Sequence, residues 1–421
     1  MSPIVDTLRG FALGAFALIA YGLYRSIAST ENDWRRLAQH LRARPRFHLF
    51  SESMNGTLEG LPFTLSRSGS VKAKKNLMTV DLSKWVNPEL ALRSKLSVGG
   101  TPWARTETFE CGEHAFDVVA QLEGPERRWR AILDGPSRRT LRRILVEGVS
   151  ISGAEAKVWL SGDATAAEIK SRIHLIRHAA EALKVEPSTV AQRLAHNVRN
   201  DAIPAVRLRC LRLLLSEYRQ TKEAQAAIEH ALDDTDDEIR VLAAVASANT
   251  KSVKILAAIV TNLCVAPALR AAALDGLVAK GERDRLPGFY ALALIADDEV
   301  LRTAAVRAMT AAGLPGAAQG LERLLNEDAS EPVRRAAGDG LAAIGDKHAV
   351  APLQRYASET TDKLSKLVAL EAVRKLQARL GDVDVGFLSL STGDSAVGAV
   401  SEVSTGAGAV SAVSDARTKA R

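Results

Sequence analysis

The sequence predicts a mainly α-helical protein in which a single N-terminal hydrophobic helix and a small α+β domain precede a C-terminal α-solenoid of about six helical hairpins. Two observations support this fold class. A short motif recurs at a nearly constant interval beyond residue 200. Aromatic residues make up only 5% of the chain, while alanine, leucine, valine and arginine are abundant. Small helix-forming side chains favour closely packed helices over a large sheet core.

The recurring motif consists of an apolar residue, a basic residue, two variable positions, a small residue and an apolar residue. Its basic positions lie 33, 30, 32, 32 and 32 residues apart. Such a period indicates stacked helical hairpins, because each hairpin buries its apolar face only against its neighbours. We assign the basic residues a structural role, in which each could pair with a carboxylate of the preceding or the following unit. They are Arg207, Arg240, Arg270, Arg302, Arg334 and, in a weaker copy, Lys366.

The fourth copy shows how one unit would be divided into two helices. Asp297, Asp298 and Glu299 supply negative charge suited to the start of the first helix. Gly313 and Pro315 break the chain, and residues 317–325 form the second helix.

Residues 201–381 therefore resemble the HEAT-repeat superfamily, particularly the short bacterial repeats related to those of phycobilisome lyases. Together with the apolar N-terminal segment and the β-containing region after it, the layout is similar to that of bacterial HEAT-repeat domain-containing proteins. The resemblance implies an α-solenoid. It also keeps open a lyase-type enzyme, or an enzyme accessory, related to bilin lyases. No chromophore site is identifiable in the sequence, so no catalytic residue is carried over.

The N-terminal segment over residues 10–24 is uncharged and lies between Arg9 and Arg25. It is shorter than the roughly 20 apolar residues of a typical spanning helix. More arginines follow it than precede it, so we predict a single-pass membrane anchor over residues 1–30 with the body in the cytoplasm. The small-residue pattern at 26–28 leaves export after signal cleavage as the alternative, although Arg25 directly after the apolar run argues against it.

Residues 31–165 are predicted to form the small α+β domain. Short β-like runs cover residues 60–66, 77–82 and 116–122, and turn signals separate them. One helix is expected at 137–147 with Ser137 as its N-terminal cap. Two further strands are expected near 149–151 and 157–160.

Two further regions complete the predicted organisation. Residues 166–200 are connecting helices, beginning with a long amphipathic helix whose apolar residues follow helical spacing. Residues 382–421 are rich in Gly, Ala, Ser and Val and are predicted to be a disordered low-complexity tail. Alternation of apolar and small polar residues in the tail would also suit strand addition to a partner's sheet.

The net charge of +7 is unevenly distributed. Residues 31–200 carry +8 and residues 201–381 carry 0. A nucleic-acid-binding solenoid, the third functional hypothesis, would need basic residues on its own surface, so the neutral repeats argue against it. The basic clusters of the front domain are interpreted as solvated faces, with contact to anionic lipid headgroups as the alternative. These clusters are Lys72, Lys74 and Lys75; Arg127, Arg128 and Arg130; and Arg138, Arg139, Arg142 and Arg143.

No phosphate-binding loop, dinucleotide fingerprint, HExxH pair or nucleophile elbow occurs in the sequence. Cys111, Cys210 and Cys264 lack disulfide or zinc-ligand spacing and are interpreted as buried thiols in a reducing compartment. His174 and His178 are four residues apart and could share a metal. No third ligand is evident, so a surface or packed pair is favoured. We predict no catalytic residue, no cofactor and no metal site.

These observations favour a non-catalytic, membrane-tethered scaffold or adaptor that binds a protein partner through the concave face of its solenoid. The membrane would be reached through residues 10–24. The predicted contact surface is the exposed face of the second helices, near Lys254, Arg285, Glu322 and Arg355.

Overall fold

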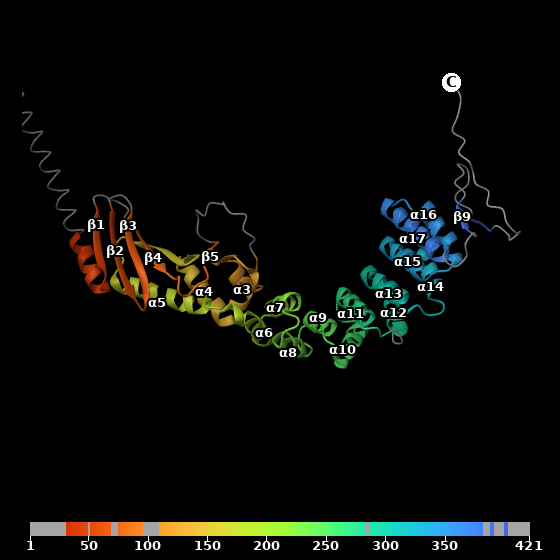
Figure 1. Cartoon of the computed structure of the whole chain (residues 1–421), viewed down its shortest axis with the longest axis horizontal. Helices are drawn as coiled ribbons and strands as arrows, with labels where there is room; N and C mark the ends of the chain where they lie inside the picture. The colour runs from red at the N-terminus through yellow and green to blue at the C-terminus, as the bar shows by residue number, and fades with distance from the viewer. Residues whose placement is uncertain are drawn as a thin grey trace, which may run out of the picture. The chain divides into compact units, whose positions relative to one another are not determined.

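A computed structural model describes residues 31–48, 51–68, 75–95, 109–282, 286–381, 388–390 and 400–402. The chain divides into two compact units, Met1–Ile239 and Arg240–Arg421, and each is described by itself (Figure 1). The described residues are mainly helical. They comprise one eight-stranded antiparallel sheet, a series of helical repeats and a separate pair of short strands.

The sheet of the first unit has the strand order β1-β2-β3-β4-β8-β7-β5-β6, and all neighbouring strands are antiparallel. Strands β4 and β8 alternate between buried and exposed residues, and their register places Met78 opposite Val158 on the buried face. The strands are β1 Arg44–His48, β2 Ser51–Leu58, β3 Leu61–Ser68, β4 Lys75–Asp81, β5 Ala91–Ser94, β6 Ala120–Glu123, β7 Ser150–Ser152 and β8 Glu155–Ser161.

Helices cover one face of this sheet and close its core. Residues 31–41 form a helix that buries Trp34 and Leu41 completely. The long helix α5 begins after Thr165, whose hydroxyl accepts a hydrogen bond from the Glu168 backbone N–H at 3.2 Å. Its apolar stripe is buried, which confirms the predicted amphipathic helix. The labelled helices here are α2 His114–Asp117, α3 Glu126–Ile132, α4 Gly135–Val146 and α5 Ala166–Leu183.

Two local predictions in this domain are wrong. The strand expected over 116–122 is divided into α2 and β6, because the Asp117 carboxylate accepts hydrogen bonds from the backbone N–H groups of Cys111 and Gly112 at 2.8 and 2.9 Å. Such side-chain bonds stabilise a turn in place of a strand. Helix α4 is capped by Asp134, not Ser137, since Asp134 accepts a 2.8 Å bond from the Ser137 N–H.

The predicted fold class needs correction at its N-terminus. None of the helices in the part of the chain that the structure describes is both long enough and apolar enough to cross a membrane. This finding contradicts the single N-terminal hydrophobic helix and the single-pass membrane localisation. The segment on which both were based, residues 10–24, lies outside the described residues.

The helical-repeat prediction is confirmed by the elements that follow. Every copy of the motif lies on the first helix of a unit, and neighbouring first helices of the second unit pack side by side. The described residues form five complete hairpins and a final single helix, where about six hairpins were expected. The helices are α6 Val190–Asn200, α7 Pro204–Glu217, α8 Lys222–Ala231, α9 Asp237–Ala246, α10 Thr250–Thr261, α11 Pro267–Ala279, α12 Leu286–Leu294, α13 Glu299–Ala312, α14 Ala317–Glu327, α15 Glu331–Ile344, α16 Val350–Glu359 and α17 Lys363–Gly381.

The fourth hairpin has the boundaries expected from its residues. Asp298 caps α13 by accepting a 3.0 Å bond from the Leu301 N–H. Gly313 ends the helix at φ 59°, a left-handed conformation that glycine adopts at little cost. Helix α14 then begins at Ala317.

A small residue recurs every 32 positions on the first helices of the second unit, at Gly276, Ala308, Gly340 and Ala372. A Cβ atom on Gly340 would lie 2.5 Å from the Thr310 Oγ1 and 2.8 Å from a Leu321 methyl carbon. A Cβ atom on Gly276 would lie 2.8 Å from Val245 Cγ2. This position therefore sets how closely successive hairpins approach.

In the predicted tail the structure describes only β9 Leu388–Leu390 and β10 Val400–Glu402, which pair antiparallel. The rest of residues 382–421 lies outside the described residues.

Candidate functional site

Two of the basic motif residues bind an aspartate in the loop that follows their own hairpin. The Arg207 guanidinium on α7 donates to both carboxylate oxygens of Asp234 at 2.8 and 2.7 Å. Arg302 on α13 makes the same forked contact with Asp328 at 3.0 and 3.2 Å. Each aspartate lies in the loop that leads to the next first helix. A forked arginine–carboxylate contact fixes geometry as well as charge, so each pair holds a first helix to the loop that follows its own hairpin.

The other motif positions make different contacts. On α15 the forward contact comes from Arg335, which donates to Asp362 at 3.2 Å, while Arg334 pairs with Glu331 of its own helix. Arg270 is buried and donates to the Val260 carbonyl at 2.9 Å. Lys366 is exposed on α17, and Arg240 lies on α9.

A buried polar cluster joins the sheet domain to the first helices that follow it. Arg138 on α4 donates to the two carboxylate oxygens of Asp201 at 2.6 and 3.0 Å, to the Leu133 carbonyl at 2.6 Å and to Glu113. Burial opposes its charge, but the bonds to Asp201 and Glu113 raise the pKa of Arg138 above its usual value. Nearby, the Asn197 amide donates to the Arg130 carbonyl at 2.8 Å.

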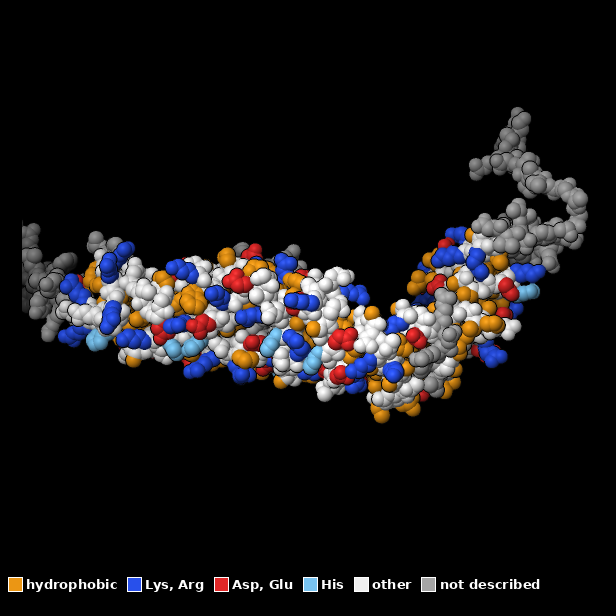
Figure 2. Space-filling model, turned by 60° about the horizontal axis from the view of Figure 1, so that its bottom comes forward, with side chains coloured by type: hydrophobic (Ala, Val, Ile, Leu, Met, Phe, Trp, Pro, Cys, Tyr) orange, Lys and Arg blue, Asp and Glu red, His pale blue; other side chains and the backbone are white. Residues whose placement is uncertain are grey.

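This cluster corrects part of the interpretation of the basic residues. Arg130 and Arg138 are buried, so they do not belong to a solvated or lipid-contacting face. Lys72 and Lys74 lie outside the described residues. On the face shown in Figure 2, Lys and Arg side chains are interspersed with Asp and Glu side chains.

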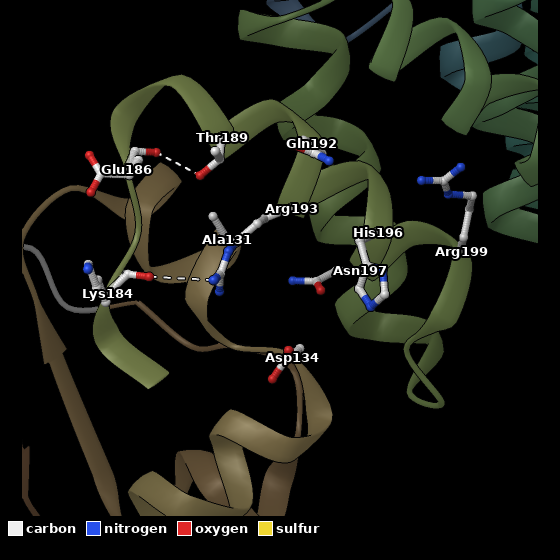
Figure 3. Close-up of a pocket in the computed structure, with 10 residues that line it drawn as sticks. All are labelled: Ala131, Asp134, Lys184, Glu186, Thr189, Gln192, Arg193, His196, Asn197 and Arg199. Carbon is white, nitrogen blue, oxygen red and sulfur yellow. Dashed lines mark hydrogen bonds between the residues drawn. The ribbon is translucent and has the colours of Figure 1, made fainter. Parts of the chain in front are cut away.

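A hollow of about 510 Å³ lies beside this cluster, between α6, the end of α5 and the junction of α3 and α4 (Figure 3). The Arg193 guanidinium donates to the Lys184 carbonyl at 3.5 Å, and the Thr189 hydroxyl donates to the Glu186 carbonyl at 2.9 Å. Asp134 already caps α4. The hollow is lined by Ala131, Asp134, Lys184, Glu186, Thr189, Gln192, Arg193, His196, Asn197 and Arg199.

Basic side chains outnumber acidic ones around the hollow. Its lining residues do not include a nucleophile next to a general base. His196 and Asn197 also line a second hollow of about 330 Å³, together with the buried Arg138 and Asp201. The buried side chains of Arg138, Asp201 and Asn197 are therefore already used in contacts that hold α3 and α4 to α6 and to the residue after it.

The titratable groups with the largest pKa shifts are buried or hydrogen-bonded within the fold. Burial raises the pKa of the Cys111 and Cys210 thiols to about 12, which keeps both neutral and unreactive. Cys264 is exposed, so the buried interpretation holds for two of the three cysteines. The described residues contain no group of three or more His, Cys, Asp or Glu side chains that could hold a metal ion.

Glu331 and Tyr356, in the last repeats, are a hydrogen-bonded pair in which both pKa values are shifted. Burial opposes the charge of Glu331, but hydrogen bonds from Ser365, Tyr356, Arg334 and Thr360 lower its pKa to about 2. Burial and the neighbouring Glu331 raise the pKa of Tyr356 to about 12. The Tyr356 hydroxyl donates to Glu331 at 2.6 Å, so this pair ties α16 to the start of α15.

A groove of about 580 Å³ runs between the first helices α13 and α15. Its two arginines are already paired: Arg307 with Asp275 on α11 at 3.1 and 2.7 Å, and Arg335 with Asp362. Asp339 has no hydrogen-bond or ion-pair partner among the described residues. Partial burial raises the pKa of its carboxyl group, although the charge of Lys375 opposes this. The lining residues are Thr303, Arg307, Thr310, Ala311, Pro332, Arg335, Ala336, Asp339 and Gly340.

The charges of this groove follow the period of the repeat. Asp275, Arg307 and Asp339 lie 32 residues apart, each five positions after a motif arginine. Residues at one repeat position line up along neighbouring helices, so this series marks a row of charges.

The predicted partner residues lie on the second helices. Lys254 on α10 and Arg355 on α16 are exposed, Glu322 on α14 is half-buried, and Arg285 lies outside the described residues. Arg355 lines another hollow of about 580 Å³ beside Tyr356 and Glu359. The hollows described above do not unite these residues in one site.

The fold defines a helical-repeat protein with an antiparallel-sheet domain before the repeats. Its sequence matches no protein-family model, and comparison with curated proteins finds no match. Among solved structures, the chain is similar to human deoxyhypusine hydroxylase in complex with glycerol, at 13% identity and a TM-score of 0.21, with 45% of this chain and 96% of that chain covered. It is also similar to the complex of CpcE and CpcF of phycocyanin lyase from Nostoc sp. PCC7120, at 15% identity and a TM-score of 0.32, with 66% and 99% covered. At these values neither likeness bears on function.

Proposed function

We propose that the chain is a non-catalytic adaptor that binds a protein partner along the first helices of its C-terminal repeats. In this proposal the groove between α13 and α15 receives a basic side chain of the partner. The observation that carries it is Asp339, an exposed carboxylate of the groove lining with no hydrogen-bond or ion-pair partner among the described residues. An opposite charge within about 4–6 Å of a carboxylate is favourable, so Asp339 suits a basic side chain of the partner.

The floor of the groove suits the stem of a lysine or arginine. It includes Ala311 and Ala336, whose short side chains leave room for methylene groups. Long basic side chains bury their stems along apolar surface while the charged end reaches a polar partner. Asp275 and Asp362 offset the charges of Arg307 and Arg335, which reduces their repulsion of such a group.

The surface around the groove is also held in place before any partner arrives. Gly340 allows α15 to approach α13 closely, and the Arg302–Asp328 pair holds the loop between α14 and α15. A preorganised surface loses less conformational entropy on binding, which favours affinity.

Affinity capture from the source lysate followed by mass spectrometry tests this proposal. The full-length chain would be compared with Asp339→Lys, with the groove-filling Ala311→Trp and with Glu322→Lys as the matched change on a second helix. We expect a protein that the unaltered chain and Glu322→Lys retain and that both groove variants lose. Circular dichroism would verify that each variant is folded.

Two outcomes would overturn the proposal. If capture persists in both groove variants and is lost in Glu322→Lys, the contact surface lies on the second helices. If the full-length chain retains no protein reproducibly, the adaptor function itself is wrong.

A further inference from the structure

The geometry points to a cation site that the sequence interpretation set aside: His174 and His178 form a two-histidine site for Cu²⁺ or Ni²⁺, oriented by Glu59 and Glu181. The two histidines lie one turn apart on α5 and share one face of the helix. Their Nε2 atoms are 3.0 Å apart, and their rings are perpendicular with centroids 4.5 Å apart.

The carboxylates determine which ring nitrogens face each other. His174 Nδ1 lies 3.0 and 3.1 Å from the two carboxylate oxygens of Glu59. An ionised carboxylate only accepts hydrogen bonds, so Nδ1 carries the proton and Nε2 of neutral His174 carries a lone pair. His178 Nδ1 lies on the side of the second ring that faces Glu181, 3.6 Å from Oε2, which is too long for a hydrogen bond.

Two nitrogen lone pairs at this distance repel unless a proton or a cation lies between them. In the cation-free protein, His178 can donate an Nε2 proton to His174. A divalent cation would replace this shared proton, and the carboxylates would then bind both Nδ1–H groups. Histidines that bind metals usually donate their other ring N–H to a carboxylate or a carbonyl in this way.

The ligand type indicates the class of cation. Imidazole nitrogens suit Cu²⁺ and Ni²⁺, and among the first-row divalent ions Cu²⁺ binds such ligands most tightly. The histidines are 57% and 53% exposed, so water can complete the coordination of the cation.

The backbone at Glu59 fixes the position of this carboxylate. Glu59 and Gly60 form the two-residue turn between β2 and β3, and Glu59 has φ 52°. Glycine, asparagine or aspartate is usual at such positions, because a larger side chain is strained there. Strained residues of this kind cluster at functional sites. Here the strained residue supplies the carboxylate that binds His174.

The positively charged side chain of Arg177 lies near the site. Arg177 is 3.9 Å from Glu59 and donates to Glu181 at 3.1 Å. Its charge is offset by these two carboxylates.

Titration of the full-length, untagged chain with CuCl₂ and with NiCl₂ tests the site, followed by calorimetry and by electron paramagnetic resonance for Cu²⁺. We expect one saturable cation per chain and a copper spectrum with two nitrogen ligands. His174→Gln and His178→Gln should each abolish this binding. Glu59→Gln should weaken it about tenfold, because the orienting carboxylate is lost. His196→Gln, which changes another exposed helical histidine, is the matched control and should leave binding unchanged.

The inference is overturned if neither cation binds, if binding persists in both His174→Gln and His178→Gln, or if His196→Gln reduces it equally. All four side chains are substantially exposed, and thermal unfolding would verify that the variants remain folded.

Discussion

Arg138 and Asp201 form a buried ion pair in which two guanidinium nitrogens lie 2.6 and 3.0 Å from the two carboxylate oxygens. Their side chains are only 3% and 1% exposed. Asp201 follows the last residue of α6, and Arg138 lies on α4, so the pair joins the sheet domain to the first helices after it. The two elements are thereby parts of one body and not domains on a linker.

Arg138→Ala should lower the free energy of unfolding of the first unit by about 3–5 kcal/mol, because it leaves the Asp201 carboxylate buried without its partner. All five tryptophans lie before residue 160, so urea denaturation followed by tryptophan fluorescence reports on this unit. The exposed Arg142→Ala on the same helix is the control. Equal losses in the two variants would contradict a special role for the buried pair.

Glu331 should make the last repeats less stable in acid. Its pKa is lowered from 4.5 to about 2 in the folded chain, so its contribution is complete above pH 4.5 and is lost as the pH falls toward 2. The difference in stability between the unaltered chain and Glu331→Gln should therefore shrink over that range, from about 3 kcal/mol. Hydrogen exchange of peptides from residues 331–381 measures it. A difference that is independent of pH would count against the prediction.

Gly340→Val should destabilise the repeats by about 1–3 kcal/mol, because the added atoms would overlap Thr310 and Leu321. Gly288→Ala on α12 is the comparison, since no atom of the described side chains lies within 4 Å of its new Cβ. That variant should gain stability from the higher helix propensity of alanine. Thermal unfolding followed by circular dichroism compares the two. If both variants change the unfolding temperature in the same direction, the packing argument is wrong.

The three thiols should differ in reactivity toward a chromogenic aromatic disulfide. Cys264 is exposed and should react quickly in the folded chain. Cys111 and Cys210 are buried and their pKa is about 12, so they should react only after unfolding in guanidinium chloride. Rapid labelling of all three in buffer would show that the core is open to solvent.

The sequence predicts the repeats well because their signal is local and periodic. The start and end of α13 follow from Asp298 and Gly313, and neither depends on distant contacts. The Arg138–Asp201 pair spans 63 positions and has no local signature, so both residues looked like ordinary surface charges. The contact between Glu59 and His174 spans 115 positions and was missed for the same reason. Sequence spacing alone also does not reveal the strand order of the sheet.

The pair between Arg302 and Asp328 lies within one period of the repeat, since the arginine and the aspartate are 26 positions apart. Duplicating or deleting a segment of one period would therefore carry this contact with it. The Arg307–Asp275 pair joins two repeats across 32 positions and would be broken at the junction. A change in the number of hairpins would thus keep the contact that fixes each loop, but would need new partners for the charges between neighbouring first helices.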